Sequence, residues 1–552
     1  MKLKDSIRKF ILANAFEHKG KAQTGAIIGK LISAKIISKD EIKKTIPTIN
    51  KLVKEINNLT LDKQEKELNK LYPEFFKKEE KKEGLKELPG AKEGKVVTRM
   101  PPEPGKYMLS GHAISFLINY LYAKKYKGKS ILRFEDTNAE KTKQEYVESF
   151  IDGVTRFLKI KPSKTVYISD DIEKMYKEIE KLIKKKKAYV CSCSAEKMSK
   201  LRRKREPCEH KKLSTAENLE LFKKMVSKKF NENTYTVRLI GDMNSNNAVL
   251  RDPVIARINY TTHYRQKNKY CIWPTYDFAN TCEDEWCGIT HVLRSIDFGE
   301  ERIELQKYIA KLLGFKEKYY IQYGRFDIQG LEKSSGRAIR ALVEKGARWD
   351  DPRMPTLAAL ERRGFVKETF EELAKQVGLS KTPTKIDSKT FSTINRRFID
   401  PIADRYFFVK DPVKINVKGN KKETIKIRKH PAEDHGFRKL TVNEEFYIPK
   451  KESKGSTIRL KDYIKINRTK NKEYIPSKNQ DLDSKVQKIQ WVPAKNNVKI
   501  EVILQDSSKT KGLGEESLKS LKEGDIIQFE RFGFCKLDKK EKDKLVFMFA
   551  HK

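Results

Sequence analysis

The chain has 552 residues, enough for several domains, and its 119 Lys and Arg residues outnumber its 76 Asp and Glu residues, giving a net charge of +43. A field of that size attracts polyanions, although a uniformly Lys-rich composition would produce the same charge without such a partner. No stretch approaches the roughly 20 apolar residues of a membrane span, the first residues lack the apolar core of a signal peptide, and seven cysteines, an odd number, favour a reduced cytoplasmic location over a disulfide scaffold.

Two amphipathic patterns predict a small helical unit within the first 76 residues. Ile7, Ile11 and Ala15 share one helical face, and Ile49 and Leu52 share another. The segment after it, up to residue 95, is dense in charge and contains scattered Gly and Pro, which is typical of a linker. We therefore expect an N-terminal helical extension and linker over residues 1–94, without catalytic residues.

Residues 95–138 predict a strand, a loop, a helix and a second strand. Val96–Val97 gives a short buried strand, the prolines of Pro101–Gly105 exclude helix and sheet pairing, and apolar residues at helical spacing follow Gly111. A loop that ends at a helix N-terminus is a natural anion site, because free backbone N–H groups and the helix dipole point at it. Gly111 allows close approach to the backbone, and His112 can donate a hydrogen bond to a phosphate oxygen.

A Gly-His pair alone is weak evidence for such a site, but its neighbours make it specific. Thr-Arg-Met-Pro-Pro-Glu-Pro precedes it from Thr98, and Leu-Arg-Phe-Glu-Asp-Thr-Asn follows it from Leu132. The combination resembles the first half of the active site of class I glutamyl- and glutaminyl-tRNA synthetases, in particular the archaeal type of glutamyl-tRNA synthetase. The nucleotide-binding motif of that family reads His-Ile-Gly-His, whereas this chain has Leu109-Ser110-Gly111-His112, so the first histidine is missing.

Two closely spaced pairs of metal-ligating side chains come next: Cys191 with Cys193, and Cys208 with His210. Three thiols and one imidazole suit a tetrahedral Zn2+ ion, and four protein ligands leave no open position, which indicates a structural role. The resembled family often carries a Cys-x-Cys…Cys-x-His zinc site here; the alternative is four unrelated side chains. Lys197–Lys200 matches the start of the family's ATP-closing Lys-Met-Ser-Lys-Ser motif, a match that we interpret as chance because the second half of the active site has not yet appeared.

The second half of the nucleotide fold begins near residue 273. Tyr276, Asn280 and Glu283 share one helical face, and Val292–Leu293 predicts a strand that carries Arg294 into the cleft. The resemblance assigns Arg294 to the side-chain carboxylate of a glutamate substrate, which a guanidinium can pair bidentately. Glutamine-specific relatives usually have a small uncharged residue there, so this arginine favours glutamate; the alternative is a solvated arginine at a strand end.

The segment Leu331–Arg337 corresponds by position, ahead of a Trp-Asp-Asp-Pro-Arg block, to the Lys-x-Ser-Lys-Arg segment that closes over ATP in the family. Lys333 is retained, whereas Gly336 replaces the second lysine. Arg337 or Arg340 could supply the missing charge.

The resemblance implies a multidomain chain of α/β and β regions. We expect a class I Rossmann-like parallel-sheet catalytic domain over residues 95–330, with an insert at about 190–265 that binds the tRNA acceptor end. A helical stem-contact region with the ATP-closing loop would span 331–392, and anticodon-binding β-barrels would span 393–552. Short predicted strands separated by polar turns are themselves typical of barrels. They are Val413–Val417, Phe446–Ile448, Val498–Leu504, Ile526–Phe529 and Leu545–Phe549.

Carried over residue by residue, the family implies two sets of site residues. The catalytic set, which would face the ATP phosphates, is Gly111, His112, Lys333 and Arg337. The substrate-binding set is Arg99, Pro101, Glu103, Glu135, Tyr276, Asn280 and Arg294. In it, Arg99 and Arg294 would hold the two carboxylates of glutamate, and Glu135 and Tyr276 would hold its ammonium group.

The implied function is a ligase that activates L-glutamate with Mg-ATP and transfers it to the 3'-terminal ribose of tRNA-Glu. The sequence leaves open whether tRNA-Gln is charged as well. Two alternatives are a glutaminyl-tRNA synthetase and a tRNA-binding paralogue with weak activation activity, because Leu109 and Gly336 both weaken phosphate contacts. We expect a cytoplasmic monomer that does not bind membranes.

Overall fold

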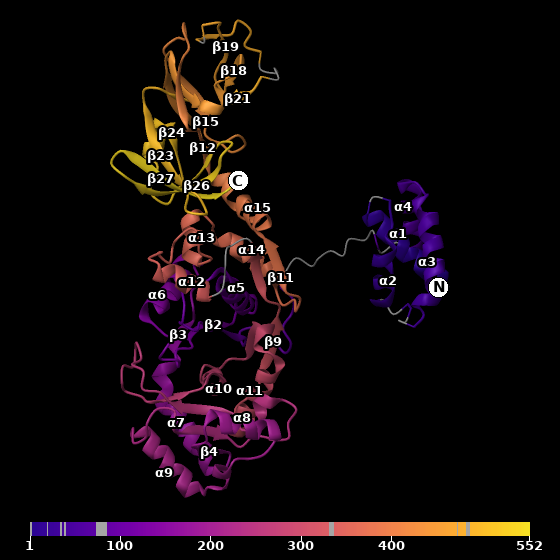
Figure 1. Ribbon diagram of the computed structural model, residues 1–552, viewed down its shortest axis with the longest axis vertical. Coiled ribbons are helices and arrows are strands. Elements are labelled where there is room, and N and C mark those ends of the chain that lie inside the picture. The colour runs from indigo at the N-terminus through magenta and orange to yellow at the C-terminus, as the bar shows by residue number, and fades with distance from the viewer. Residues whose placement is uncertain are drawn as a thin grey trace. The chain divides into compact units, whose positions relative to one another are not determined.

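The computed structural model describes residues 3–18, 20–33, 36–37, 40–72, 75, 85–329, 336–471, 473–481 and 486–552. The chain forms two compact units, Met1–Gly84 and Leu85–Lys552 (Figure 1). Lys333 of the predicted ATP-closing segment lies outside the described residues, and so do the side chains of Arg337 and Arg340, whereas Gly336 is the first residue of a helix. Within the described ranges, none of the helices combines the length and hydrophobicity that a membrane crossing requires.

The N-terminal unit confirms the predicted helical extension. Its helices are α1 (Leu3–Glu17), α2 (Thr24–Ser33), α3 (Ile42–Asn57) and α4 (Leu61–Leu71). Ile11 and Ile49 are fully buried in its core. Two buried amides fasten the helix ends: Asn14 Oδ1 accepts a hydrogen bond from Gln23 N at 2.7 Å, and Gln64 Nε2 donates at 2.8 Å to a carbonyl in the last turn of α3.

The predicted parallel sheet is present in the second unit. β1 (Val97–Met100), β2 (Lys129–Phe134) and β3 (Lys164–Tyr167) pair in parallel, and β8 (His291–Ser295) pairs in parallel with β9 (Tyr319–Tyr323). Val97 N donates to Thr290 Oγ1 at 2.9 Å, and Thr290 N donates to Val97 O at 3.0 Å. These bonds place β1 beside β8 and give the order β3-β2-β1-β8-β9.

Four helices flank the sheet. They are α5 (Ser110–Lys125), α6 (Gln144–Asp152), α10 (Tyr276–Trp286) and α11 (Glu300–Leu313). Ile114 and Leu117 of α5 are buried against the core, as the helical spacing predicts. Because α5 follows β1 and α10 precedes β8, the N-termini of both helices lie at the carboxyl edge of the strands, where parallel sheets place ligand sites.

An insert that shares a hydrophobic core with α10 and α11 follows β3. It consists of α7 (Ile172–Lys184), β4 (Ala188–Cys191), α8 (Ala195–Lys204), α9 (Thr215–Val226), β5 (Thr236–Leu239), β6 (Val254–Ile258) and β7 (Ile272–Pro274), with the strands antiparallel in the order β4-β5-β6-β7. Asp136, just after β2, accepts hydrogen bonds from Ser169 N and the Tyr264 hydroxyl, each at 2.9 Å. These contacts fasten the insert to the carboxyl edge of the parallel sheet.

A helical region connects the catalytic sheet to the C-terminal strands. It contains β10 (Phe326–Gln329), α12 (Gly336–Glu344), α13 (Leu357–Arg363), α14 (Lys367–Val377), β11 (Thr384–Asp387) and α15 (Ser388–Ile399). Leu357 N at the start of α13 donates to Met108 O at 2.9 Å, just before α5. At its other end, Arg362 donates two hydrogen bonds to Asp538, at 2.7 and 2.8 Å, so one short helix contacts both neighbouring regions.

The C-terminal region is rich in strands, as predicted. A seven-stranded, nearly barrel-like sheet contains β12 (Asp404–Tyr406), β25 (Ile526–Phe529), β26 (Gly533–Lys540), β27 (Lys544–His551), β23 (Asn497–Ile503), β24 (Lys509–Glu515) and β13 (Phe408–Lys410) in that order. Smaller sheets contain β14 (Pro412–Asn416), β15 (Glu423–Arg428), β16 (Phe437–Val442), β17 (Glu445–Pro449), β18 (Thr457–Leu460), β19 (Lys465–Arg468), β20 (Tyr474–Pro476), β21 (Lys488–Ile489) and β22 (Val492–Pro493). Their core surrounds the fully buried Trp491.

Gly128, between α5 and β2, lies at a position where the chain before β2 passes very close to the start of β1. A Cβ atom at this position would lie 2.0 Å from Val96 O. We expect Gly128→Ala to push the strands apart at a cost of about 1–3 kcal/mol, and so to lower the temperature of thermal unfolding measured by calorimetry. Gly25→Ala is the control, because a Cβ at this helical glycine meets nothing within 4 Å. Equal transition temperatures for the two variants would contradict the tight approach.

Candidate active site

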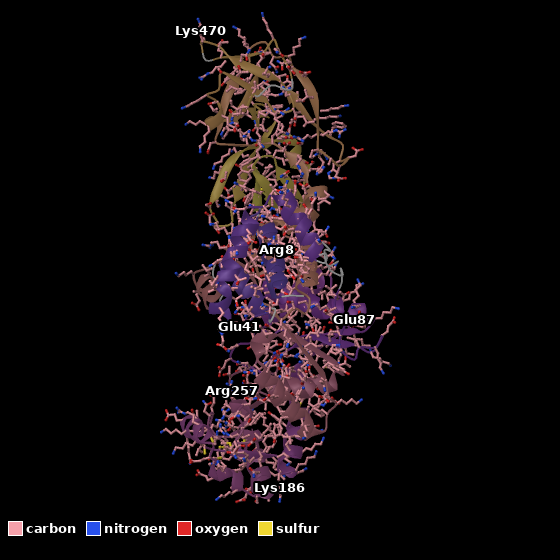
Figure 2. All side chains as sticks on the ribbon, turned by 90° about the vertical axis from the view of Figure 1, so that its right-hand side faces the viewer. Arg8, Glu41, Glu87, Lys186, Arg257 and Lys470 are labelled. Carbon is pink, nitrogen blue, oxygen red and sulfur yellow. The ribbon has the colours of Figure 1, made fainter. Side chains whose placement is uncertain are left out.

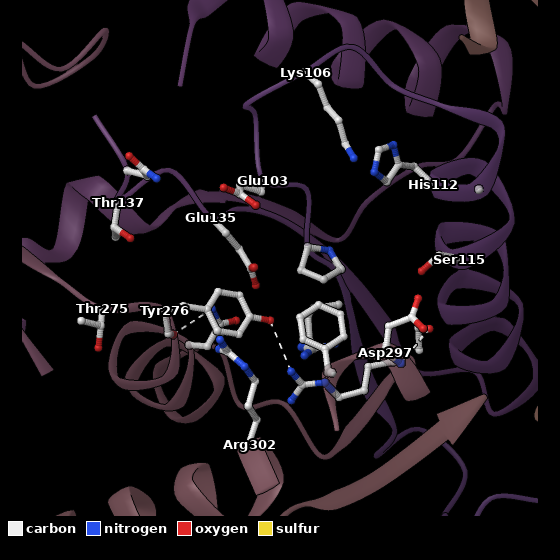
Figure 3. Close-up of a pocket in the computed structure, with 18 of the residues that line it drawn as sticks. Glu103, Lys106, His112, Ser115, Glu135, Thr137, Thr275, Tyr276, Asp297 and Arg302 are labelled. Carbon is white, nitrogen blue, oxygen red and sulfur yellow. Dashed lines mark hydrogen bonds between the residues drawn. The ribbon is translucent and has the colours of Figure 1, made fainter. Parts of the chain in front are cut away.

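A cleft of about 1400 Å³ opens at the carboxyl edge of the parallel sheet. Both halves of the predicted site line it, although they are far apart in sequence (Figure 3). The lining includes every described member of the predicted catalytic and substrate-binding sets: Arg99, Pro101, Glu103, Gly111, His112, Glu135, Tyr276, Asn280 and Arg294. The remaining two, Lys333 and the Arg337 side chain, lie outside the described residues.

The His112 ring is fixed at the N-terminus of α5. Its Nδ1 accepts a hydrogen bond from Leu109 N at 3.0 Å, which leaves the ring proton on Nε2. Burial, with a smaller contribution from the charge of Lys106, lowers the pKa of His112 to about 3. The imidazole is therefore a neutral donor on the cleft wall. Space is available beside it, because a Cβ built on Gly111 meets nothing within 4 Å.

Leu109, which stands where the family motif has its first histidine, has a different surrounding. Its side chain packs against an apolar cluster of Ile339, Met354 and Ala359 from α12, α13 and the segment between them. Its backbone forms a β-bridge with Thr356. An imidazole in this apolar contact would lose hydrogen bonds to water, which explains physically why leucine fits here.

Arg294, at the end of β8, is a buried guanidinium whose direct hydrogen-bond and ring partners are neutral. It is 3% exposed. Nη1 donates to Gln306 Oε1 at 2.8 Å, Nη2 donates to the Tyr276 oxygen at 3.4 Å, and the guanidinium lies 4.2 Å from the centre of the Phe298 ring. Across the described residues, Nε of Arg294 finds no hydrogen-bond acceptor and no carboxylate pairs with the group. The charge of Asp277 reaches Arg294 only across Gln306, whose Nε2 donates to Asp277 Oδ1 at 3.0 Å. A buried guanidinium without a direct ion-pair partner calls for an anionic ligand.

Arg99 and Glu135 face the cleft from β1 and from the end of β2. Arg99 is 2% exposed and donates from Nε to Asp284 Oδ1 at 3.2 Å. Glu135 is 7% exposed, and its Oε1 accepts a hydrogen bond from Arg133 at 3.3 Å. Burial raises the pKa of Glu135, and the charges of Arg133 and Arg99 oppose that rise. Tyr276 completes this side of the cleft; burial raises the pKa of its hydroxyl, which therefore stays protonated.

Sequence reasoning missed several residues around the pocket. Gln306 and Phe298 hold the Arg294 guanidinium, and Arg133 and Asp284 hold the groups on the opposite side. One sequence signal pointed to Arg133 and Asp284: each is a charged residue that lies inside or beside a motif of the resembled family. Glu283 shares the face of α10 predicted for Tyr276 and Asn280, but it does not line the cleft. Its Oε2 accepts a hydrogen bond from Cys287 Sγ at 3.6 Å, and burial raises the pKa of Glu283 to about 8.

The four predicted metal ligands come together at one edge of the cleft. Their ligand atoms all lie within 4.8 Å of one another, and Cys193 also lines the cleft. Cys191 Sγ and Cys208 Sγ are 3.8 Å apart, which matches the edge of about 3.8 Å expected for a tetrahedron with metal–sulfur bonds of about 2.3 Å. His210 directs Nδ1 at Cys193 Sγ, 3.4 Å away, while its Nε2 contacts Ser192 Oγ at 2.8 Å.

That outer contact orients the imidazole as a metal ligand requires, because a proton on Nε2 leaves the Nδ1 lone pair free. Hydrogen bonds from Cys191 and, to a smaller extent, from Tyr189 lower the pKa of the Cys208 thiol to about 4, which provides a thiolate. Lys197–Lys200 lies on the adjacent helix α8, where Lys197 pairs with Glu209 at 2.6 Å.

Comparisons with known proteins cover nearly the whole chain. A family model described as tRNA synthetases class I (E and Q), catalytic domain, matches residues 95–401, and two models for the anti-codon binding domain of that class match residues 403–484 and 488–538. The glutamate–tRNA ligase of Pyrococcus abyssi is 38% identical over 568 aligned residues, covering 99% of each chain. The glutamate–tRNA ligase of Nitrosopumilus maritimus is 37% identical, covering 100% of this chain and 99% of that protein. A solved glutamate tRNA ligase from Elizabethkingia meningosepticum aligns with 18% identity and a TM-score of 0.40, over 55% of this chain and 70% of that one.

The surroundings of His112 predict an unusual titration. We expect its ring to stay neutral, with the proton on Nε2, down to about pH 4, because burial holds its pKa near 3. Nitrogen NMR of histidine-labelled protein measures this directly, and the His112→Gln variant assigns the signal. A His112 resonance that titrates near pH 6 would contradict the buried, neutral donor.

Proposed function

Because this chain belongs to the class I tRNA synthetases for glutamate and glutamine, we propose that its cleft joins L-glutamate to ATP and that its outer regions present tRNA to the product. The chain is a glutamate–tRNA ligase, the activity that its curated relatives carry over their full length. Four parts of the chain would share this activity: the amino-acid pocket, the phosphate side of the cleft, the tRNA-facing regions and the cluster of three cysteines and one histidine.

Arg294 supports glutamate as the amino acid. Its buried guanidinium is surrounded by Gln306, Tyr276 and Phe298, none of which carries a negative charge. The side-chain carboxylate of glutamate would supply the missing counter-charge with fork geometry. The neutral amide of glutamine would leave the charge buried and unpaired, which is costly. The same argument disfavours the glutaminyl alternative.

The rest of the amino acid fits the remaining polar groups of the pocket. Arg99 is assigned to the α-carboxylate, and Glu135 together with the Tyr276 oxygen is assigned to the ammonium group. Pro101, Glu103 and Asn280 complete the lining. A paralogue that had lost activation would have no need of this pocket, so its intact polar lining supports an active enzyme.

ATP is assigned to the side of the cleft at the start of α5. The neutral His112 and the open space beside Gly111 would receive the phosphates, and Lys333 and Arg337 would close over them. Mg2+, the ion that accompanies ATP in this class, would neutralise phosphate charge. An oxygen of the α-carboxylate would attack the α-phosphorus, and the bond to pyrophosphate would break; a ribose hydroxyl of tRNA would then take the glutamyl group and release AMP. Catalysis would come from orientation and charge stabilisation.

The tRNA would contact the insert, the helical region and the C-terminal sheets. We assign the acceptor end to the insert, the stem to residues 331–392 and the anticodon to the strands after residue 393. Charged side chains extend from the insert and from the C-terminal sheets, as Lys186 and Lys470 show (Figure 2). The net charge of +43 suits this partner. These substrates imply a cytoplasmic enzyme, and we propose that a monomer is sufficient, because one chain supplies both halves of the cleft.

Cys191, Cys193, Cys208 and His210 would hold Zn2+. With all four positions filled by protein, the ion would cross-link β4 to the segment after α8. Since Cys193 also lines the cleft, this cross-link would fix the wall along which the tRNA terminus enters.

Replacing Arg294 tests the amino-acid pocket. We expect Arg294→Ala to abolish glutamate-dependent pyrophosphate exchange, measured with ATP and tRNA, and Arg294→Lys to lose at least about tenfold in kcat/KM because a lysine cannot form the fork. Arg8→Ala is the control, since it removes a guanidinium from ion pairs with Glu55 and Glu67 in the N-terminal unit. Near-normal exchange by Arg294→Ala, or exchange with glutamine in place of glutamate, would contradict the proposal. Charging of purified tRNA-Glu and tRNA-Gln shows which tRNA is used.

The metal site predicts one zinc ion per chain by elemental analysis. Cys208→Ser is expected to lose the ion and to lower both the unfolding temperature and the rate of transfer to tRNA. Cys271→Ser, which replaces a buried cysteine outside the four-ligand set, should keep the ion. Finding no zinc in the wild-type protein would remove the metal proposal and leave the ligase activity untouched.

A further inference from the structure

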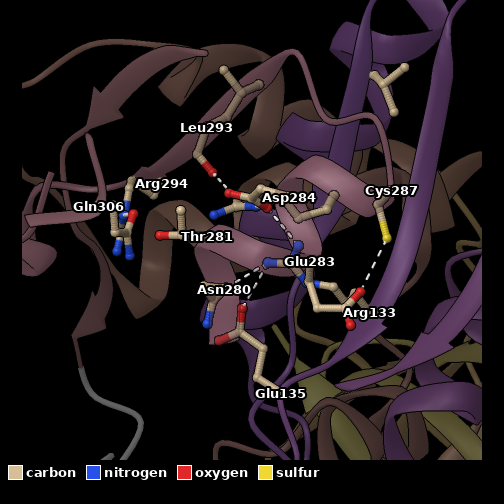
Figure 4. Close-up of polar contacts among 12 residues, drawn as sticks. Arg133, Glu135, Asn280, Thr281, Glu283, Asp284, Cys287, Leu293, Arg294 and Gln306 are labelled. Carbon is tan, nitrogen blue, oxygen red and sulfur yellow. Dashed lines mark hydrogen bonds and ion pairs between the residues drawn. The ribbon is translucent and has the colours of Figure 1, made fainter. Parts of the chain in front are cut away.

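Arg133 is a fully buried arginine beneath the pocket, and it does not line the cleft. Its two terminal nitrogens reach three acceptors from two elements (Figure 4). Nη1 donates to Asp284 Oδ1 at 2.6 Å, and Nη2 donates to Asn280 Oδ1 at 2.6 Å and to Glu135 Oε1 at 3.3 Å. Glu135 and Asn280 line the cleft themselves, so Arg133 contacts the pocket walls from behind.

Asp284 anchors this arrangement. The same oxygen that accepts from Arg133 also accepts from Arg99 Nε at 3.2 Å. Burial alone would raise the pKa of Asp284, but the two guanidiniums outweigh burial and hold the pKa below its ordinary value. Two arginines and two carboxylates thus form a buried chain of alternating charge, Arg99–Asp284–Arg133–Glu135.

We propose that Arg133 is a positioning residue of the amino-acid pocket, which aims the Glu135 carboxylate at the ammonium group of the substrate without touching the substrate. The inference rests on the proposed function, in which Glu135 receives that ammonium group. Arg133 is suited to the role because a planar guanidinium presents donors in several fixed directions. A lysine in its place could approach one or two of the three acceptors but would not hold all of them in a fixed arrangement.

The charges around Glu135 explain why an ionised carboxylate needs this support. Arg133 faces it from its own strand, Arg99 from β1, and Asp284 and Tyr276 from α10. The pKa of Glu135 is raised overall, because burial, with a smaller contribution from Asp284, outweighs the opposing charges of Arg133 and Arg99. Without Arg133, only Arg99 opposes the increase in the pKa of Glu135 that burial and Asp284 cause. Glu135 then takes up a proton at a higher pH than in the wild-type protein. A protonated Glu135 carries no charge to pair with an ammonium group.

The test is the pH dependence of KM for glutamate in tRNA-supported pyrophosphate exchange between about pH 6 and pH 9. For Arg133→Met we expect KM for glutamate to rise about tenfold at pH 7 and to fall again as pH increases, because Glu135 then ionises. The KM for ATP should change less than about twofold. Arg133→Lys keeps the positive charge, so its KM should rise by a few-fold with no new pH dependence.

Glu283→Gln is the matched control. Glu283 is also buried beside Arg133, from the same helix as Asp284, but it faces Cys287 and not the cleft. We expect this variant to keep the wild-type KM for glutamate within about twofold at each pH. Thermal unfolding of each variant shows whether it is folded, and Arg133→Lys keeps the inference testable if Arg133→Met does not fold.

Two outcomes separate this inference from the proposed function. If Glu135→Gln leaves KM for glutamate unchanged, the assignment of the ammonium site is wrong and the proposed pocket fails. If Glu135→Gln raises KM but folded Arg133→Met has the wild-type KM, or a raised KM that is flat with pH, then the pocket stands and the positioning role of Arg133 is overturned. A new pH dependence in Arg133→Lys equal to that of Arg133→Met would also overturn it, because the charge would then be irrelevant.

Discussion

Three hydrogen bonds between Val97 and Thr290 join segments that are 193 residues apart in the chain. Through them β1 lies beside β8, so the carboxyl ends of strands from both halves of the chain meet at one edge of a parallel sheet. Arg99 and Arg294 stand on these two strands and therefore face one cleft. All of the proposed chemistry depends on that pairing, because neither half alone holds both ends of a dicarboxylic amino acid.

The cleft contrasts two ways of burying a guanidinium. Arg99 and Arg133 share Asp284, and their charges are compensated within the protein. Arg294 is equally buried but is held by an amide, a phenol and an aromatic ring. These neutral partners fix its direction, and the nearby Asp277 carboxylate is bound to Gln306 and makes no ion pair with Arg294. An incoming carboxylate therefore gains more at Arg294 than at the compensated pair, and this difference directs the side chain of the substrate to one end of the pocket.

Local pattern predicted the strands and helices at the cleft, and the family resemblance predicted a set of residues whose described members line it. Ile114 and Leu117 are buried where helical spacing put them, and the ends of β1, β2 and β8 carry the predicted side chains. What the sequence could not predict depends on contacts between distant segments. Glu283 is one turn from Asn280, yet it contacts Cys287 at the end of its own helix, while its neighbour Asp284 meets Arg99 and Arg133 from β1 and β2.

Leu109 shows how such contacts change the meaning of a motif. Judged against the family pattern, its substitution for histidine removes a polar group near the phosphates. In the structure the same position is an apolar contact to Ile339, Met354 and Ala359, and its backbone pairs with Thr356. Thr356 in turn caps α13, whose Arg362 binds Asp538 in the C-terminal sheet. The start of α5 is therefore held by a segment that also holds the C-terminal sheet, so a displacement of that sheet relative to the cleft must strain either the ion pair or the contacts around Leu109.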